Sequence, residues 1–173
     1  MDDVLSQPTR RRLYELVGSH PGSSAREIQR LSGLAWGETA YHLDQLIQAG
    51  LLRRERGGRR DYYFQLDMTW EDRRVLLTLR SPMERKILVE LVQSPGLTLT
   101  ELRDRTQTSV STVSSHLRRL LALGLVESDK STNYRQYRPA HPLRVALLLQ
   151  KYQGSFRDRL VDRFIETWRE LIG

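Results

Sequence analysis

Residues 110–120 gather small hydroxyl and guanidinium side chains in one stretch with helical spacing. They are Ser111, Thr112, Ser114, Ser115, Arg118 and Arg119. Hydroxyl groups near the N-terminus of a helix can approach base edges or phosphates, and arginine can donate two hydrogen bonds to guanine in the major groove of DNA. A solvated helix face also prefers serine, threonine and arginine, so a purely structural interpretation stays open.

A second basic segment surrounds Gly57 and Gly58. It contains Arg53, Arg54, Arg56, Arg59 and Arg60, set against Glu55 and Asp61. A glycine turn flanked by arginines suits a hairpin that lies along a phosphate backbone or enters a minor groove. The arginines expected to make these contacts are Arg54, Arg56, Arg59 and Arg60. The alternative is a charged hairpin whose arginines keep its edges from pairing with other chains.

The four histidines do not form a metal-binding pattern. His42 and His116 each lie at the border of an apolar helix face, where an imidazole packs and hydrogen-bonds the backbone; a phosphate contact is the alternative. His20 and His141 lie in unrelated positions, so a metal would lack ligands. The sequence also has no cysteine, no Gly-rich phosphate loop, no G-x-S-x-G and no H-E-x-x-H. It therefore predicts no enzyme, no metal and no cofactor.

Composition favours a folded, basic protein. The 173 residues include 28 Lys and Arg against 21 Asp and Glu, so the net charge is 28 − 21 = +7. No apolar run approaches the roughly 20 residues of a membrane span, and the acidic start lacks a signal-peptide pattern, which predicts a cytoplasmic protein. The positive charge favours an acidic partner such as nucleic acid, although the excess of arginine over lysine can also reflect codon usage.

The chain repeats itself at an offset of 74 residues. Eleven identical pairs align without a gap between Pro8 and Tyr63 of the first copy and their equivalents in the second. Turn and cap residues match as well as leucines, which chance alignment of unrelated helices would not easily produce. We infer two copies of one unit. The matching pairs include Pro21-Gly22 with Pro95-Gly96, His42 with His116, and Gly50-Leu51 with Gly124-Leu125.

Each copy has the pattern of three helices followed by a two-stranded hairpin. N-cap serine or threonine with glutamate three residues later predicts helix starts, and glycine predicts the end of the third helix. The predicted capping boxes are Ser24–Glu27, Ser81–Glu84 and Thr98–Glu101; the glycines are Gly50 and Gly124; the hairpin turns are Gly57-Gly58 and residues 131–133. Three helices and a hairpin predict a winged helix-turn-helix, a mainly α fold with small β-hairpin wings (α+β).

Residues 109–120, Ser-Val-Ser-Thr-Val-Ser-Ser-His-Leu-Arg-Arg-Leu, followed by Gly124-Leu125-Val126, resemble the recognition helix and first wing strand of ArsR/MarR-type regulators. Residues 34–43 are similar but less typical. Two such units with a C-terminal helix resemble the tandem winged-helix regulators common in archaea, over roughly residues 6–66 and 81–139. The resemblance implies that each third helix reads the major groove and each wing contacts the backbone or minor groove.

The two copies differ in charge on the third helix. In the first copy this resemblance assigns DNA contacts to Trp36, Glu38, Tyr41 and Gln45, and in the second wing to Lys130, Asn133 and Arg135. Glu38 and Asp44 on the first helix would meet phosphate repulsion, and no cation offsets them there. A glutamate can nevertheless accept a hydrogen bond from cytosine N4, so base reading by the first helix stays open. Our hypothesis is that the second copy supplies most of the base-specific readout, while the first supplies mainly backbone contacts through its wing.

Two further helical patterns connect and extend the copies. Residues 70–79 predict a joining helix, and a long pattern follows Pro142, which Gly154 could kink or divide. Its apolar stripe is expected to be exposed and to form a dimer, with packing within the chain as the alternative. The residues assigned to dimerisation are Leu149, Tyr152, Phe156, Leu160, Phe164 and Trp168.

The predicted organisation is a winged helix-turn-helix at 1–67, a joining helix at 68–81, a second winged helix-turn-helix at 82–139 and a dimerisation segment at 140–173. The predicted function is a sequence-specific, double-stranded DNA-binding transcriptional regulator that acts as a homodimer. The alternative is a tandem winged-helix architectural or protein-interaction subunit of transcription or chromosome machinery, which the acidic first recognition helix favours.

Overall fold

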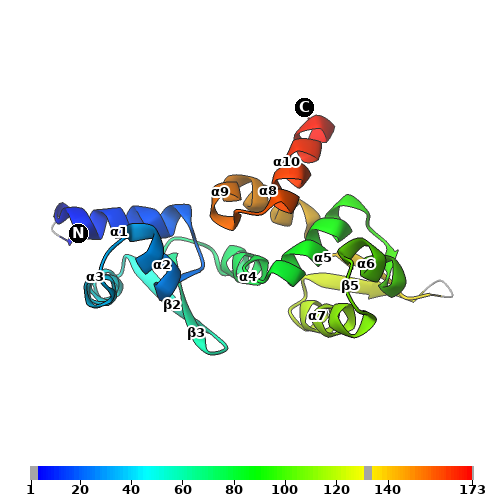
Figure 1. Ribbon diagram of the computed structural model, residues 1–173, viewed down its shortest axis with the longest axis horizontal. Helices are drawn as coiled ribbons and strands as arrows, with labels where there is room; N and C mark the ends of the chain where they lie inside the picture. The colour runs from blue at the N-terminus through cyan, green and yellow to red at the C-terminus, as the bar shows by residue number, and fades with distance from the viewer. Residues whose placement is uncertain (1–3, 131–133, 173) are drawn as a thin grey trace. The chain divides into compact units, whose positions relative to one another are not determined.

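The computed structural model describes residues 4–130 and 134–172, and the chain divides into two compact units, Met1–Leu77 and Thr78–Gly173. Figure 1 shows that each unit is mainly helical with short strands. The boundary between the units falls inside helix α4 (Trp70–Leu79), which matches the joining helix predicted at residues 70–79.

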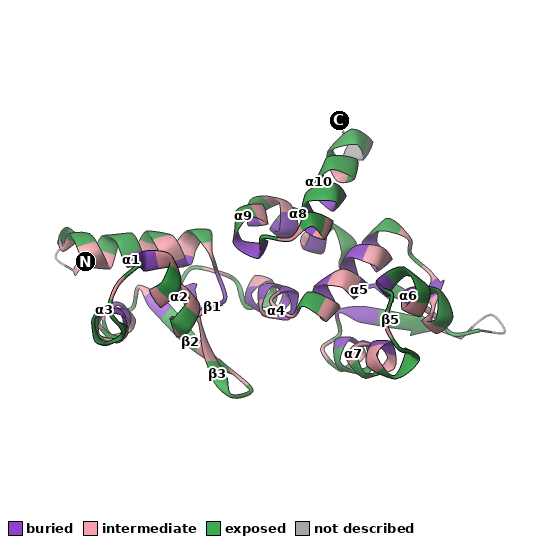
Figure 2. Cartoon of the chain, viewed as in Figure 1, coloured by how far each residue is buried: buried purple, intermediate pink, exposed green. Residues whose placement is uncertain are grey.

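Unit 1 packs three helices against a small antiparallel sheet. Its elements are η1 (Val4–Ser6), α1 (Pro8–Ser19), β1 (Ser23–Ser24), α2 (Ala25–Ser32), α3 (Trp36–Gln48), β2 (Leu52–Gly57) and β3 (Arg60–Gln65). Leu43 and Leu46 on α3 are buried against Leu13 of α1 and Ile28 of α2. Because these leucines recur at helical spacing, α3 buries one face and exposes the other, as Figure 2 shows.

Unit 2 repeats this arrangement around a central helix. Its elements are α5 (Pro82–Gln93), β4 (Leu97–Thr98), α6 (Leu99–Thr106), α7 (Val110–Ala122), β5 (Val126–Asp129), β6 (Gln136–Pro139), α8 (Pro142–Lys151), α9 (Gln153–Phe156) and α10 (Arg159–Ile172). Helix α5 packs against α6, α7, β6, α8 and α10. It is therefore buried almost all round, through Ile87, Leu88, Val89, Leu91 and Val92.

Local signals place the helix ends correctly. Gly50 and Gly124 follow the last residues of α3 and α7 with φ of 68° and 63°, the left-handed conformation that glycine adopts without strain. The turn at Gly57-Gly58 is confirmed between β2 and β3, and Gly58 has φ 64°. The corresponding turn predicted at residues 131–133 lies outside the described residues.

The two strands of each predicted hairpin pair as expected, β2 with β3 and β5 with β6, and each sheet has a third strand that the sequence did not predict. The described residues form two three-stranded sheets, in the orders β1-β3-β2 and β4-β6-β5. Strand β1 pairs Ser23 with Tyr63, and strand β4 pairs Leu97 with Tyr137. Strands of two residues have no detectable alternation, so the sequence pattern could not predict them.

The C-terminal segment also differs from its prediction. The helical pattern divides into α8, α9 and α10, and Arg157 lies in the left-handed region (φ 46°) just before α10, whereas Gly154 lies inside α9. The break lets α10 pack on α8 and α5. The stripe expected to be exposed is therefore mostly covered within unit 2: Leu149, Tyr152, Phe156 and Phe164 are buried, and Leu160 and Trp168 are half-buried.

The three predicted capping boxes have three outcomes. At Thr98–Glu101 both reciprocal hydrogen bonds form at the start of α6. At Ser24 the hydroxyl accepts a hydrogen bond from the Glu27 N–H, as predicted. At Ser81 the prediction is wrong, because Ser81 is the N-cap but its side chain makes no capping hydrogen bond, and Glu84 points into the protein instead.

Replacing Thr98 by alanine is expected to lower the free energy of unfolding of unit 2 by about 1 kcal/mol at neutral pH, because the cap of α6 is lost. Denaturant unfolding would measure the change. Thr100→Ala is the matched control, since Thr100 is an exposed threonine in the same helix. An equal loss in both variants would contradict a capping role.

The effect should depend on pH in a defined direction. Hydrogen bonds from the Thr98 N–H and hydroxyl lower the pKa of Glu101 below its ordinary value of 4.5. A carboxyl whose pKa is lowered by folding adds stability above its unfolded pKa and loses that contribution as the pH falls through the folded value. The difference between wild type and Thr98→Ala should therefore shrink below pH 4.5.

Candidate nucleic-acid interface

The exposed face of α7 carries the polar side chains that the sequence singles out. Val113, Leu117 and Leu120 bury the opposite face in the core of unit 2. Ser111, Ser115, Arg118 and Arg119 are exposed, and Thr112 and Ser114 are partly exposed. The N-cap Ser109 accepts a hydrogen bond from the Thr112 N–H (3.1 Å), which fixes the start of the helix. The six predicted residues thus share one accessible helix in unit 2.

The hydroxyls at the start of α7 form a small network. The Ser109 hydroxyl lies 2.9 Å from that of Ser111 and 2.8 Å from that of Thr112. A hydroxyl that is already oriented by a neighbour still has lone pairs and, depending on its rotation, a proton to offer. The first turn of α7 therefore presents fixed hydroxyl groups beside backbone N–H groups, an arrangement that suits phosphate or base-edge contacts.

Arg118 and Arg119 differ in their surroundings. Arg118 is exposed, whereas one guanidinium nitrogen of Arg119 lies 3.2 Å from Oε1 of the fully buried Glu84. His116 lies at 3.3 Å from the same oxygen through Nδ1. The sequence missed Glu84 as a neighbour of this face, because it fits a local capping pattern. The alignment of the two copies could have indicated a special role for Glu84. It aligns this glutamate with Arg10, so the charge is reversed at one position of the repeated unit.

The wing of unit 2 is described only in part. Lys130 and Arg135 are exposed, as a backbone contact would require, and Asn133 lies outside the described residues. Arg138 on β6 donates a hydrogen bond to Asp129 on β5 (2.9 Å), which ties the two wing strands together. The described part of this wing therefore presents two accessible cations, Lys130 and Arg135.

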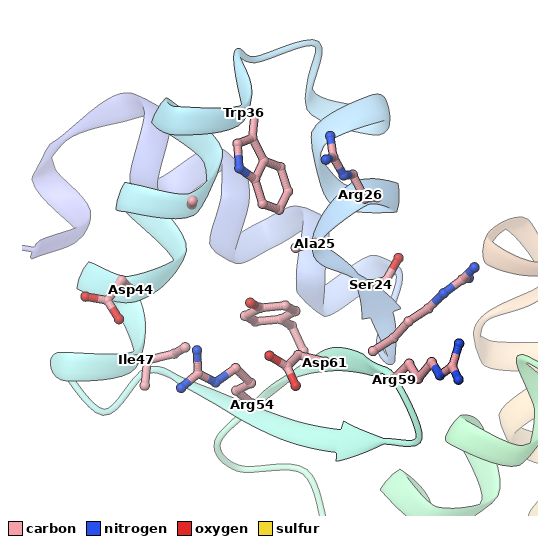
Figure 3. A pocket seen from close by; sticks show the side chains of 12 residues that line it. Ser24, Ala25, Arg26, Trp36, Asp44, Ile47, Arg54, Arg59 and Asp61 are labelled. Atoms are coloured by element: carbon pink, nitrogen blue, oxygen red, sulfur yellow. The ribbon is translucent and has the colours of Figure 1, made fainter.

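Unit 1 has a groove of about 540 Å³ lined by α2, α3 and the β2–β3 hairpin. Figure 3 shows Trp36 of α3 and Arg26 of α2 facing each other, with Arg54 and Asp61 on the hairpin. The Arg26 guanidinium lies 4.2 Å from the centre of the Trp36 ring, a cation–π contact that holds both side chains. Four arginines and two aspartates line the groove, so its balance is positive. The arginines are Arg26, Arg54, Arg59 and Arg60, and the aspartates are Asp44 and Asp61.

Charges within the hairpin decide which arginines are available. Arg56 pairs with Asp61 at 3.0 Å, and Glu55 pairs with Arg73 of α4. Arg54, Arg59 and Arg60 are exposed beside the groove. Burial raises the pKa of the Tyr63 hydroxyl, and the Arg54 guanidinium opposes this shift only in part, so the hydroxyl stays protonated at neutral pH. The groove therefore offers several hydrogen-bond donors to an anion.

The other predicted residues of α3 are accessible but not cationic. Trp36 and Tyr41 are exposed, Glu38 is exposed and Gln45 is partly buried. Of the repeated histidines, His42 is buried as predicted and its ring packs edge-on against Tyr41, but its Nδ1 has no hydrogen-bond partner among the described residues. The structure thus places the predicted cations of unit 1 beside α3 rather than on it.

Comparison with known proteins assigns both units. Residues 7–76 match a family model described as an N-terminal HTH domain, and residues 80–132 match a model of the MarR family. The chain is a tandem winged helix-turn-helix protein whose second domain is of MarR type. These are families of DNA-binding transcription regulators and not of enzymes.

One relative matches over both domains of this tandem winged helix-turn-helix protein. It is the uncharacterized HTH-type transcriptional regulator MJ1398 of Methanocaldococcus jannaschii, 30% identical over 132 residues. The match covers 76% of this chain and 33% of that protein, so the chain spans about a third of its relative's length. Among solved structures, the DIP2311 protein from Corynebacterium diphtheriae matches 80% of this chain and 27% of its own, with 14% identity and a TM-score of 0.33, too low to support an argument.

The described part of this tandem winged helix-turn-helix protein shows no cluster of three or more His, Asp or Glu side chains arranged to hold a metal ion. Among the described helices, none is long and apolar enough to cross a membrane.

Proposed function

We propose that this chain is a sequence-specific, double-stranded DNA-binding transcriptional regulator that acts as a homodimer. The observation that carries the proposal is the exposed face of α7, where fixed hydroxyls and two arginines lie on one accessible recognition helix. Arginine at such a face can donate two hydrogen bonds to guanine, and hydroxyls can contact base edges or phosphates. The match of each domain to a helix-turn-helix family supports the same conclusion.

In this proposal the two units make different kinds of DNA contact. Unit 2 reads bases through α7, because its recognition helix carries cations and short polar side chains. Unit 1 contacts mainly the backbone, because Glu38 and Asp44 on α3 repel phosphate while Arg54, Arg59 and Arg60 line the groove beside it. A sugar–phosphate strand lying in this groove would meet guanidinium groups and the protonated Tyr63 hydroxyl.

Two sets of variants test the division. Arg118→Gln is expected to lower the ratio of specific to random DNA affinity roughly tenfold, because a base contact is lost. The double variant Arg59→Gln/Arg60→Gln is expected to weaken binding to all duplexes and to reduce the slope of log K against log salt by about 1.8, or 0.9 for each lost phosphate contact. Titrations against a duplex selected from genomic fragments and against a random duplex, at several salt concentrations, provide both quantities.

The control for charge is Arg163→Gln, since Arg163 is exposed on α10 and belongs to neither proposed contact segment. It should leave the specificity ratio unchanged. Equal loss of specificity in Arg118→Gln and in the wing double variant would contradict the division of work between the units.

The second candidate function is an architectural or protein-interaction subunit. The acidic recognition helix α3 favours it, together with the exposed aromatic rings of Trp36 and Tyr41. No preference for any genomic fragment, combined with tight binding to a protein partner, would decide for this alternative and against a sequence-specific regulator.

The homodimer is proposed on a different surface from the one that the sequence predicted. The six stripe residues assigned to dimerisation are largely used inside unit 2, so they offer little surface to a partner. Leu143 and Leu147 lie one turn apart on α8 and are 60% and 51% exposed. Large apolar side chains exposed on one helix face suit a symmetric contact with the same face of a second copy.

A further inference from the structure

Glu84 is a fully buried carboxylate in the first turn of α5 (0% exposed). Its Oε1 lies 3.2 Å from an Arg119 guanidinium nitrogen and 3.3 Å from Nδ1 of His116. Both partners lie on the recognition helix α7. Its other oxygen, Oε2, is buried and has no hydrogen-bond partner among the described residues. One buried acid of the core thus holds two side chains of the candidate DNA-reading helix.

Burial of this carboxylate is costly and calls for an explanation beyond packing. A buried ionised carboxylate is stable only when paired, and an apolar residue of similar size would serve the core at least as well. The first turn of α5 lowers the cost, because unpaired backbone N–H groups and the helix dipole favour negative charge there. Even so, only one of the two carboxylate oxygens has partners among the described residues. We take this to indicate that Glu84 acts on the side chains of α7 that it contacts, and not only on the packing of the core.

The repeat offers an internal comparison. At the offset of 74 residues, Glu84, His116 and Arg119 correspond to Arg10, His42 and Gln45 of unit 1. There the acid is replaced by a base and the arginine by a neutral amide, and both Arg10 Nε and His42 Nδ1 are buried without a hydrogen-bond partner among the described residues. The histidine is therefore common to both units, buried in unit 1 and partly exposed in unit 2, whereas the pair of buried acid and surface arginine belongs to unit 2.

The Arg119 side chain is held at one nitrogen by Glu84 and is still accessible to solvent. Its side chain is 61% exposed although one of its nitrogens contacts a buried oxygen. A guanidinium has five N–H donors, and a single contact leaves the others free to face outward. A long side chain held at one point loses less conformational freedom when it binds, which favours a fixed readout contact.

We propose that Glu84 is a positioning residue for DNA readout, which holds Arg119 in one conformation on α7 so that its outward donors meet a guanine edge in the major groove. This inference rests on the proposed DNA-binding function. Glu84 touches no DNA itself. It acts through Arg119, and His116 contacts the same carboxylate oxygen from the same helix.

A double-mutant cycle tests the coupling between the two residues. Glu84→Gln keeps the shape and an acceptor oxygen but removes the charge, and Arg119→Gln removes the reading side chain. Glu84→Gln is expected to lower the specific-to-random affinity ratio roughly five- to tenfold when Arg119 is present, and less than about twofold in the Arg119→Gln background. Binding to random duplex should hardly change, because no phosphate contact is lost.

A second measurement does not depend on the fold of any variant. Nitrogen NMR of the arginine side chains in the wild-type protein should show slow guanidinium rotation for Arg119 and fast rotation for its exposed neighbour Arg118, which is the control. A loss of the specificity ratio that is the same with and without Arg119 would overturn the proposal, as would equally fast rotation of the two guanidinium groups. A different result would overturn the proposed function instead: wild-type protein that binds the selected and the random duplex equally while the Arg119 guanidinium rotates slowly. Arg119 would then be held in place but would read no base.

Discussion

Replacing Arg85 by methionine is expected to lower the free energy of unfolding of unit 2 by about 3 kcal/mol. Arg85 is buried on α5, and its Nε and a terminal nitrogen donate to one carboxylate oxygen of Asp158 at 2.8 and 2.7 Å. Its remaining terminal nitrogen donates to the Leu79 carbonyl at 2.6 Å. Methionine keeps apolar volume but leaves the carbonyl of buried Leu79 and one oxygen of the partly exposed Asp158 without their donor. An unsatisfied buried acceptor costs more than the bond itself contributes.

The surroundings of Arg85 explain why the loss should be large. Asp158 immediately precedes α10, so the ion pair fixes the point where the C-terminal helix begins on α5. The ring of Phe156 lies 5.4 Å from the Arg85 guanidinium and 5.2 Å from that of Arg80, which also donates to the Ser155 carbonyl. Loss of Arg85 therefore weakens the attachment of α9 and α10 as well as one ion pair.

The repeat supplies a matched control for this variant. Arg11 aligns with Arg85 and is identical in type, but it is exposed and its Nε donates to the Leu5 carbonyl at 3.0 Å. Arg11→Met should cost about 0.5 kcal/mol or less, as exposed substitutions do. Hydrogen exchange of the unit 2 amides in Arg85→Met and of the unit 1 amides in Arg11→Met, measured with denaturant unfolding, would report the two effects. Similar losses in the two variants would contradict the role assigned to the buried ion pair.

The fold was predictable where its signals are local. Cap residues such as Thr98 and terminal glycines such as Gly124 act on backbone groups within a few residues, and each occurs twice in a repeated unit, so chance matches are filtered out. The third strands were not predictable, because two residues such as Ser23 and Ser24 become a strand only through pairing with β3, about 40 residues away along the chain.

The candidate site was predictable only in outline. Residue types placed Arg118 and the wing arginines on accessible surfaces, since the repeat fixed which faces are buried. Glu84 was assigned to a cap because its spacing from Ser81 satisfies a local rule, whereas its partners lie 32 and 35 residues away on another helix. The groove of unit 1 combines three elements, so its chemistry emerges only when α2, α3 and the hairpin are assembled.

The C-terminal stripe shows the limit of periodicity. Spacing predicts that a helix has an apolar face, but it does not say what covers that face. Here the apolar face of α10 is covered by α8 and α5 of the same unit, since the chain turns at Arg157. No glycine stands at this turn, so the sequence does not mark it. The stripe and the dimer surface are therefore separable by experiment.

Replacing Phe164 by alanine is expected to lower the free energy of unfolding of unit 2 by about 3 to 5 kcal/mol, because a large buried ring leaves a cavity. Phe164 is 1% exposed, and its ring stacks on that of Trp168 with centroids 5.8 Å apart. If this stripe belongs to the core of one chain, the loss is independent of protein concentration and the folded variant keeps the mass of the wild type. A loss that grows on dilution would instead place Phe164 in a dimer interface.

The complementary variant addresses the exposed face of α8. Leu143→Ser/Leu147→Ser removes two leucines that unit 2 leaves uncovered, so the unfolding free energy of the monomer should change by no more than about 1 kcal/mol. Sedimentation should show a dimer for wild type and a monomer for this variant, if the two leucines form the symmetric contact. Phe164→Ala is thus expected to change stability but not mass, and the double leucine variant to change mass but not stability. If both variants changed the same property, core and dimer interface would not be separate surfaces, and the dimer proposal would fail.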